Sequence, residues 1–267
     1  MKQRRKIVIK IGTNALSEED GSLDISTMSN LVDQITYLKR EKYFDVILIT
    51  SGSVSSGKSL YSGLTIGDEV LERQVFSAIG QVKLMNTYYK LFYENGFYCA
   101  QVLATKEDFR DNDHSQNMSN CINALLDEKV IPIVNENDVI AIKELMFTDN
   151  DELAGLIASM LRVDYLFLLT SVDGVYDGNP YNPNSKLIKT INVHDEELDE
   201  YIYPIKSSFG RGGMGTKIQI AKQLSEQGVD AFIVNGKTRN VILSSLYGEN
   251  AGTHFSAKSF NKTESNL

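Results

Sequence analysis

One short stretch carries much of the information about the fold class: Asp45-Val46-Ile47-Leu48-Ile49-Thr50-Ser51-Gly52. After Asp45 comes an unbroken run of β-branched and aliphatic residues, which is typical of a strand buried on both faces of a parallel sheet. Its last part is a polar turn. The stretch therefore predicts a buried parallel strand whose carboxyl end carries polar groups.

The same pattern recurs along the chain and alternates with helical patterns. Apolar residues spaced by three and four recur within 28–38, 118–126 and 153–161, and Asp24 or Ser26 is a candidate cap for the first of these helices. This alternation predicts an α/β fold, a three-layer αβα sandwich around a mainly parallel twisted sheet. The further predicted strands are Lys6–Ile11, Phe97–Leu103, Val130–Asn135, Asp164–Thr170 and Asp230–Asn235.

The composition narrows the class of protein. The 267 residues suit one domain over 1–255 with a polar tail at 256–267, and the stretch 178–184 reads as an ordered loop. A net charge of −8 argues against general binding to nucleic acid or to acidic membranes. Two cysteines and three histidines make a disulfide framework and a thiolate zinc site improbable. With no signal-like or membrane-spanning apolar run, we expect a cytoplasmic protein.

Polar segments gather where these strands are predicted to end. Each segment alone could be ordinary turn chemistry. Because the carboxyl ends of parallel strands share one edge, where open α/β sheets bind ligands, we expect one shared site there. The segments are 10–14, 50–52, 135–138 and 170–174.

Two lysines are candidates for binding a phosphate group. Lys10 lies within an apolar strand, which rarely tolerates a lysine unless its charge has a use. The loop Gly210–Lys217 has four glycines before a helical pattern, so its backbone and the helix N-terminus can approach a phosphate closely. Lys217 in the first helical turn is poorly placed for the helix dipole but well placed for an anion.

Asp149, Asn150 and Asp151 precede another helical pattern. One acid is expected there as a helix cap, but two acids and an amide exceed what capping needs. A carboxylate between the two lysines could orient both, and the amide could hold a substrate. A metal-ligand role for Asp149 or Asp151 stays open.

The segment from Gly52 to Ser59 matches the P-loop pattern G-x-x-x-x-G-K-[ST] after a predicted strand. The residues that follow contain two further glycines and show no helical stripe, whereas a P-loop opens into a helix. The P-loop hypothesis also leaves Lys10 and Lys217 without a role. We therefore treat a P-loop nucleoside triphosphatase as a remote alternative.

Taken in order, these motifs resemble the amino acid kinase superfamily from Lys6 to about His254. The most specific part is the pair Asn135-Glu136-Asn137-Asp138 and Asp149-Asn150-Asp151. Uridylate kinases share the segment 172–176 but not this pair, and they remain the alternative within the superfamily. The quoted motifs are 10–14, 50–54, 135–138, 147–154, 168–170, 173–176 and 212–217.

The resemblance implies ATP-dependent phosphorylation of the γ-carboxylate of L-glutamate, the first step of proline biosynthesis, with Mg²⁺ as cofactor. It implies that Asp138 meets the substrate ammonium and that Asp151 holds the two lysines. It also implies an amino-acid lobe in the N-terminal half and a nucleotide lobe over about 171–255. The implied catalytic residues are Lys10, Lys217 and Asp151; the glutamate-binding residues are Ser51, Gly52, Asn135, Asp138, Asp149 and Asn150; the ATP-binding residues are Lys10, Gly12, Thr170, Ser171, Gly212, Gly213, Met214, Gly215, Thr216 and Lys217.

The sequence departs from the superfamily pattern in three places. Ser171 stands where an aspartate is usual, Lys58 and Ser59 stand where small residues are commoner, and the chain is too short for the appended PUA domain of many members. The resemblance leaves open proline as a feedback inhibitor, hand-off of the labile acyl phosphate to glutamate-5-semialdehyde dehydrogenase, and a homo-oligomeric state. A non-catalytic amino-acid sensor is a further alternative, against which the presence of both lysines argues.

Overall fold

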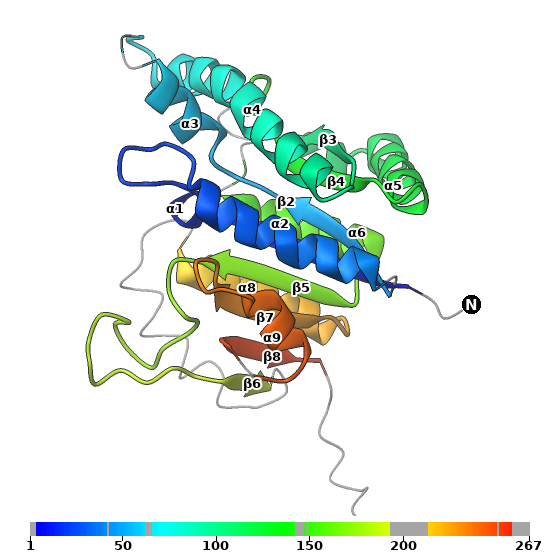
Figure 1. The fold of residues 1–267 in the computed structure, drawn as a ribbon, viewed down its shortest axis with the longest axis vertical. Coiled ribbons are helices and arrows are strands. Elements are labelled where there is room, and N and C mark those ends of the chain that lie inside the picture. The colour runs from blue at the N-terminus through cyan, green and yellow to red at the C-terminus, as the bar shows by residue number, and fades with distance from the viewer. Residues whose placement is uncertain are drawn as a thin grey trace, which may run out of the picture.

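The computed structural model describes residues 4–41, 43–61, 63, 66–141, 147, 149–192, 213–249 and 251–257. Within these ranges, eight strands form one sheet in the order β3-β4-β2-β1-β5-β7-β8-β6 (Figure 1). All neighbours from β3 to β7 are parallel, whereas β8 is antiparallel to β7 and parallel to β6. The strands are β1 (Arg5–Ile11), β2 (Phe44–Ile49), β3 (Cys99–Ala104), β4 (Ile131–Glu136), β5 (Tyr165–Thr170), β6 (Thr190–Asn192), β7 (Asp230–Asn235) and β8 (Thr253–Ser256).

Helices cover both faces of this sheet. One apolar cluster joins the sheet to α2, α4 and α9, and a second joins its other face to α5, α6 and α8. The predicted three-layer αβα sandwich with a mainly parallel sheet is thus confirmed. The helices are α1 (Thr13–Leu16), α2 (Ile25–Arg40), α3 (Ser53–Leu60), α4 (Glu69–Glu94), α5 (Asn112–Asp127), α6 (Asn150–Leu161), α8 (Met214–Glu226) and α9 (Val241–Leu246), with a 3₁₀ turn, η1, at Glu107–Phe109.

The side chains of β1 alternate between these two clusters, which explains the buried lysine. Ile7 and Ile9 pack with α2 and α4, whereas Val8 packs with α6 and α8. Lys10 shares the face of Val8, because side chains two residues apart in a strand point the same way. Its side chain therefore points toward the helices that carry the other charged residues of the site.

The order of the strands reverses direction beside Lys10, which makes this place a topological switch point of the sheet. After β1 the chain continues to β2 on one side, whereas after β5 it continues to β6 and β7, which lie on the other side. Ligands of open α/β sheets bind beyond the carboxyl ends of the strands where the order reverses in this way. Here that point lies beyond Ile11 and Thr170, the last residues of β1 and β5.

Most predicted elements have counterparts, with one large omission. The carboxylate of Asp24 caps α2 by accepting from the backbone N–H of Thr27 at 2.9 Å, so Asp24 rather than Ser26 is the cap. The sequence analysis did not identify α4, the 26-residue helix after Asp68. Its buried stripe steps by four residues through Phe76, Gly80, Leu84, Tyr88 and Phe92. This stripe is visible in the sequence as apolar residues and a glycine spaced by four.

The P-loop alternative fails on local geometry. The first helical residue after β2 is Ser53, so Gly57 and Lys58 lie inside α3 rather than in a loop that could cradle a phosphate. A Cβ on Gly57 would collide with the backbone carbonyl of Phe76, so the glycine permits close packing of α3 against α4. The ammonium of Lys58 is 2.9 Å from Glu72, so Lys58 pairs on the surface of a helix.

The described part of the chain contains no helix with the length and apolar character needed to span a lipid bilayer.

Candidate active site

Lys10, Asp151 and Lys217 form a buried group of charges at the carboxyl edge of the sheet. Nζ of Lys10 lies 2.6 Å from Oδ1 of Asp151, and Nζ of Lys217 lies 2.6 Å from Oδ2. The side chain of Asp151 is 0% exposed. Burial alone would raise the pKa of Asp151, but the two ammonium groups outweigh it and hold this pKa below its ordinary value. One carboxylate thus keeps two cations close together.

Three different elements supply these side chains. β1 carries Lys10, the first turn of α6 carries Asp151, and the first turn of α8 carries Lys217. The carboxylate of Asp149 caps α6 by accepting from the backbone N–H of Asp151 at 2.7 Å. This cap, together with the favourable position of an anion near a helix N-terminus, fixes Asp151 between the lysines.

A cavity of about 170 Å³ lies against the two lysines. α8 begins there after Gly213, and no side chain among the described residues caps its N-terminus. The unpaired N–H groups of its first turn and the two ammonium groups make the cavity suited to phosphate. The predicted ATP-binding residues Met214, Gly215 and Thr216 form this turn, while Gly212 lies outside the described residues. Other residues that line the cavity are Gly12, Thr13, Asn14, Thr170 and Ser171.

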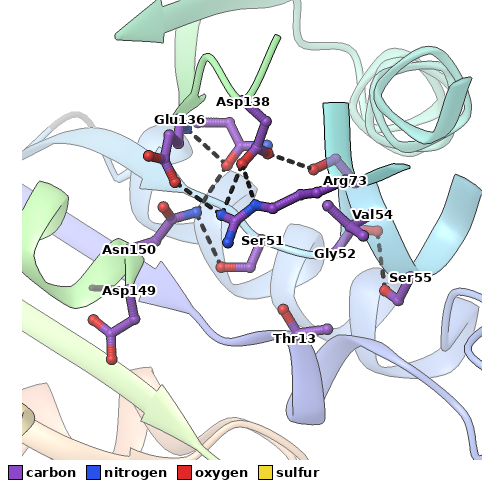
Figure 2. Close-up of a pocket in the computed structure, with 12 residues that line it drawn as sticks. Thr13, Ser51, Gly52, Val54, Ser55, Arg73, Glu136, Asp138, Asp149 and Asn150 are labelled. Atoms are coloured by element: carbon purple, nitrogen blue, oxygen red, sulfur yellow. Dashed lines mark hydrogen bonds and ion pairs between the residues drawn. The ribbon is translucent and has the colours of Figure 1, made fainter. Parts of the chain in front are cut away.

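A second cavity, of about 280 Å³, is lined by the residues drawn in Figure 2 and adjoins the first. The two cavities share Thr13, Ser51, Asp149 and Asn150, so a ligand in one can reach a ligand in the other. The second cavity brings together every residue predicted to bind glutamate: Ser51, Gly52, Asn135, Asp138, Asp149 and Asn150.

The side-chain amide of Asn150 links the carboxyl ends of two strands, β2 and β4, between the cavities. Its Nδ2 donates to the backbone carbonyl of Thr50 at 2.6 Å, to Oγ of Ser51 at 3.1 Å and to Oδ1 of Asn135 at 2.8 Å. Asn135 in turn donates to Gln81 of α4 at 2.9 Å. These bonds use the donors of Asn150 within the protein, so its Oδ1 is the atom that can meet a ligand's donor.

Asp138 lies in the second cavity with its charge already paired. Nε and Nη2 of Arg73 donate to its Oδ1 at 2.9 and 2.8 Å, and Ser77 donates to its Oδ2 at 2.9 Å. Nη2 of Arg73 also lies 3.2 Å from Glu136. Burial and the neighbouring charge of Asp138 raise the pKa of Glu136. Arg73 is therefore the counter-ion of two buried carboxylates, as Figure 2 shows.

Asp149 faces both cavities with one unused oxygen. Its Oδ1 caps α6, while its Oδ2 is buried and has no hydrogen-bond partner among the described residues. Burial, assisted by the negative charge of Asp151, raises the pKa of Asp149 to about 6. A buried carboxylate oxygen without a partner is an open position for a cation or a donor.

α4 contributes to this site, although none of its residues was among the predicted site residues. Arg73, Ser77 and Gln81 all lie on that helix and hold residues that line the second cavity. These three residues lie on the same side of α4 as its buried stripe, because residues three and four apart are neighbours on a helix, so the stripe also marks them as facing the sheet. Among the described residues, no group of three or more histidine, cysteine, aspartate or glutamate residues is arranged to hold a metal ion.

Solved structures share this fold at low sequence identity. The isopentenyl phosphate kinase of T. acidophilum, in a product complex, superposes with a TM-score of 0.69 at 16% identity, over 94% of this chain and 99% of that one. A carbamate kinase from Giardia lamblia bound to AMP-PNP gives a TM-score of 0.67 at 17% identity, over 96% of this chain and 99% of that one.

Sequence comparisons give closer relatives. The family model described as "Amino acid kinase family" matches residues 5–235. A glutamate 5-kinase of Bacteroides thetaiotaomicron is 49% identical over 92% of this chain and 68% of its own length. A glutamate 5-kinase of Chlorobaculum tepidum is 46% identical over 95% of this chain and 70% of its own length. The chain belongs to the amino acid kinase family, and within that family it groups with the glutamate 5-kinases.

Proposed function

We propose that this chain transfers the γ-phosphoryl group of ATP to the γ-carboxylate of L-glutamate, giving L-glutamyl 5-phosphate for proline biosynthesis. The observation that carries the proposal is the buried Lys10–Asp151–Lys217 group, which lies beside two adjoining cavities. One cavity suits phosphate and the other holds polar groups for an amino acid. The relatives named above are glutamate 5-kinases, which supports the same acceptor.

The chemical step needs no general base, because a carboxylic acid with a pKa near 4.3 is already ionised at neutral pH. A γ-carboxylate oxygen of glutamate forms a bond to the γ-phosphorus as the bond from that phosphorus to the bridging oxygen of ADP breaks. The crowded negative charge is the main obstacle. We assign Lys10 and Lys217 to neutralising it, with Asp151 holding both ammonium groups in place.

The two cavities divide the substrates. Ser51, Gly52, Asn135, Asp138 and Asn150 hold glutamate in the larger one, where the acidic side chains attract the substrate ammonium. The phosphates of ATP occupy the smaller cavity, and we assign Gly12, Thr170, Ser171 and the segment from Gly212 to Lys217 to ATP binding. This arrangement corresponds to an amino-acid lobe in the N-terminal half and a nucleotide lobe over about 171–255, within one domain over 1–255.

Mg²⁺ fits this site as a companion of ATP. It commonly takes one or two carboxylates together with phosphate oxygens, and it would screen the charge of the phosphates during transfer. The residue that fits is Asp149, because its buried Oδ2 has no hydrogen-bond partner among the described residues and it lines the ATP cavity. Asp151 is less suited, because both of its oxygens face lysines.

A panel of acceptors tests the proposal. Purified protein with ATP and Mg²⁺ is given L-glutamate, N-acetyl-L-glutamate or UMP, and release of ADP is followed. We expect turnover with L-glutamate alone, because Asp138 and Glu136 favour a free ammonium. Equal or faster turnover with UMP would assign the chain to the uridylate kinase reaction, and tight glutamate binding without ADP release would assign it to sensing.

A further inference from the structure

Arg73 is a cation in an acceptor cavity that is otherwise acidic. The described residues that line this cavity include three carboxylates, those of Glu136, Asp138 and Asp149, and Arg73 is the sole cation among them. L-glutamate would bring two further carboxylates and one ammonium. Its γ-carboxylate is directed to Lys10 and Lys217 by the proposed reaction, which leaves the α-carboxylate in need of a positive partner.

The geometry leaves part of the guanidinium available for such a partner. Nε and Nη2 of Arg73 are engaged by Asp138 and Glu136, whereas no described residue accepts from Nη1. The side chain is 42% exposed while its two carboxylate partners are almost fully buried. A guanidinium is planar, and two buried carboxylates fix the orientation of this one. The edge that carries Nη1 is therefore already ordered, so binding an anion there costs little further side-chain entropy.

We propose that Arg73 binds the α-carboxylate of the amino-acid substrate and that the Arg73–Asp138 pair together recognises the zwitterionic head of glutamate. The pair presents a positive edge to the α-carboxylate and a negative group to the ammonium. Arg73 is then a specificity-determining residue, because an acceptor without an α-carboxylate leaves its Nη1 without an anion. This inference rests on the proposed function of the same site.

The test compares two acceptors in each variant. L-isoglutamine, the α-amide of L-glutamate, keeps the ammonium and the γ-carboxylate but has a neutral carboxamide in place of the α-carboxylate. We measure kcat/KM from ADP release for both acceptors in the wild-type protein, in Arg73→Gln and in Arg73→Lys. Lys58→Gln is the matched control. Lys58 pairs with Glu72, the residue of α4 next to Arg73, but it does not line the cavity.

We expect Arg73→Gln to lower kcat/KM for L-glutamate by about 10- to 100-fold, mainly through KM, which is the usual effect of losing a bond between charged groups. Any loss that both acceptors share cancels in the ratio of their kcat/KM values. Beyond that shared loss, kcat/KM for L-isoglutamine should change by less than about threefold, so the preference for L-glutamate collapses. Arg73→Lys keeps a positive charge but lacks the planar guanidinium, so it should restore part of the preference. Lys58→Gln should keep the wild-type preference.

Two results would overturn the inference, and they differ from failure of the proposed function. If Arg73→Gln lowers kcat/KM for both acceptors by the same factor, Arg73 serves only to hold Asp138 and Glu136. If Arg73→Gln changes neither value, Arg73 neither holds these carboxylates in the active geometry nor contacts the α-carboxylate. In both cases the wild-type protein still phosphorylates L-glutamate, whereas failure of the proposed function removes that wild-type activity itself. Because the ratio of acceptors is internal to each variant, partial loss of folded protein does not affect the outcome.

Discussion

Replacing Asp151 with asparagine removes one charge and almost no volume at the centre of the site. Asp151 is the shared partner of two buried ammonium groups, each 2.6 Å away. Without it, Lys10 and Lys217 remain buried near each other with no described carboxylate between them. Breaking a buried ion pair by removing one partner typically costs about 3–5 kcal/mol. A loss of about 3 kcal/mol or more is therefore expected, a large part of the roughly 5–15 kcal/mol of a typical domain.

The cost should depend on what occupies the phosphate cavity. Urea unfolding of wild-type protein and Asp151→Asn, with and without a non-hydrolysable ATP analogue, measures it. Because phosphate oxygens can replace the lost counter-ion, the analogue should stabilise the variant more than the wild type. At the same time kcat should fall by about 10²-fold or more, as when a preorganised electrostatic group is lost. A destabilisation below about 1 kcal/mol, or an unchanged kcat, would refute the assignment of Asp151 as the residue that holds the lysines.

Three further predictions follow from single residues. The pKa of Asp149 is raised to about 6 in the folded protein above about 3.9 in the unfolded chain, so folding stability is lost as the pH rises between these values and the penalty persists above them. Asp149→Asn, which can still cap α6, should therefore raise the urea midpoint at pH 8 and change it little at pH 4; a midpoint that falls at pH 8 would contradict this. Gly57→Ala should destabilise the protein by about 1–3 kcal/mol through the collision with Phe76, as measured by thermal unfolding, whereas a cost equal to that of Gly67→Ala, at a site open on all sides, would show that α3 and α4 can move apart. Lys58→Ala should change kcat by less than about tenfold in steady-state assays, because Lys58 pairs with Glu72 on a helix surface; a dead variant that is still folded would restore the P-loop reading.

The sequence was sufficient to predict the six parallel strands from β3 to β7 in the sheet order, because each is a mainly apolar run. The predicted strands are nearly continuous apolar runs, and the structure contains a parallel strand at each of them. β6 and β8 were not predicted, since three and four residues at the sheet edge carry too little apolar periodicity to be recognised. Polar residues at strand ends were placed at one edge by the general rule for parallel sheets, without any knowledge of side-chain contacts.

The site was only partly accessible to the same reasoning. Lys10 was identifiable because a lysine within an apolar strand conflicts with its surroundings, and such conflicts often mark functional positions. Arg73 was not, because an arginine on a helix is ordinary in sequence. Its pairing with Asp138, 65 residues away along the chain, depends on how α4 packs. Gly57 shows that a motif can match by coincidence, because a glycine needed to pack α3 against α4 also completes the P-loop pattern.

Trapping the product with hydroxylamine tests the central claim most directly, because an acyl phosphate yields a hydroxamate whereas a phosphate ester or anhydride does not. Wild-type protein with ATP, Mg²⁺, L-glutamate and hydroxylamine should form γ-glutamyl hydroxamate in step with ADP release. Folded Lys10→Ala and Lys217→Ala should form it at least about 10²-fold more slowly. ADP release without hydroxamate, or normal hydroxamate formation by both lysine variants, would contradict the account.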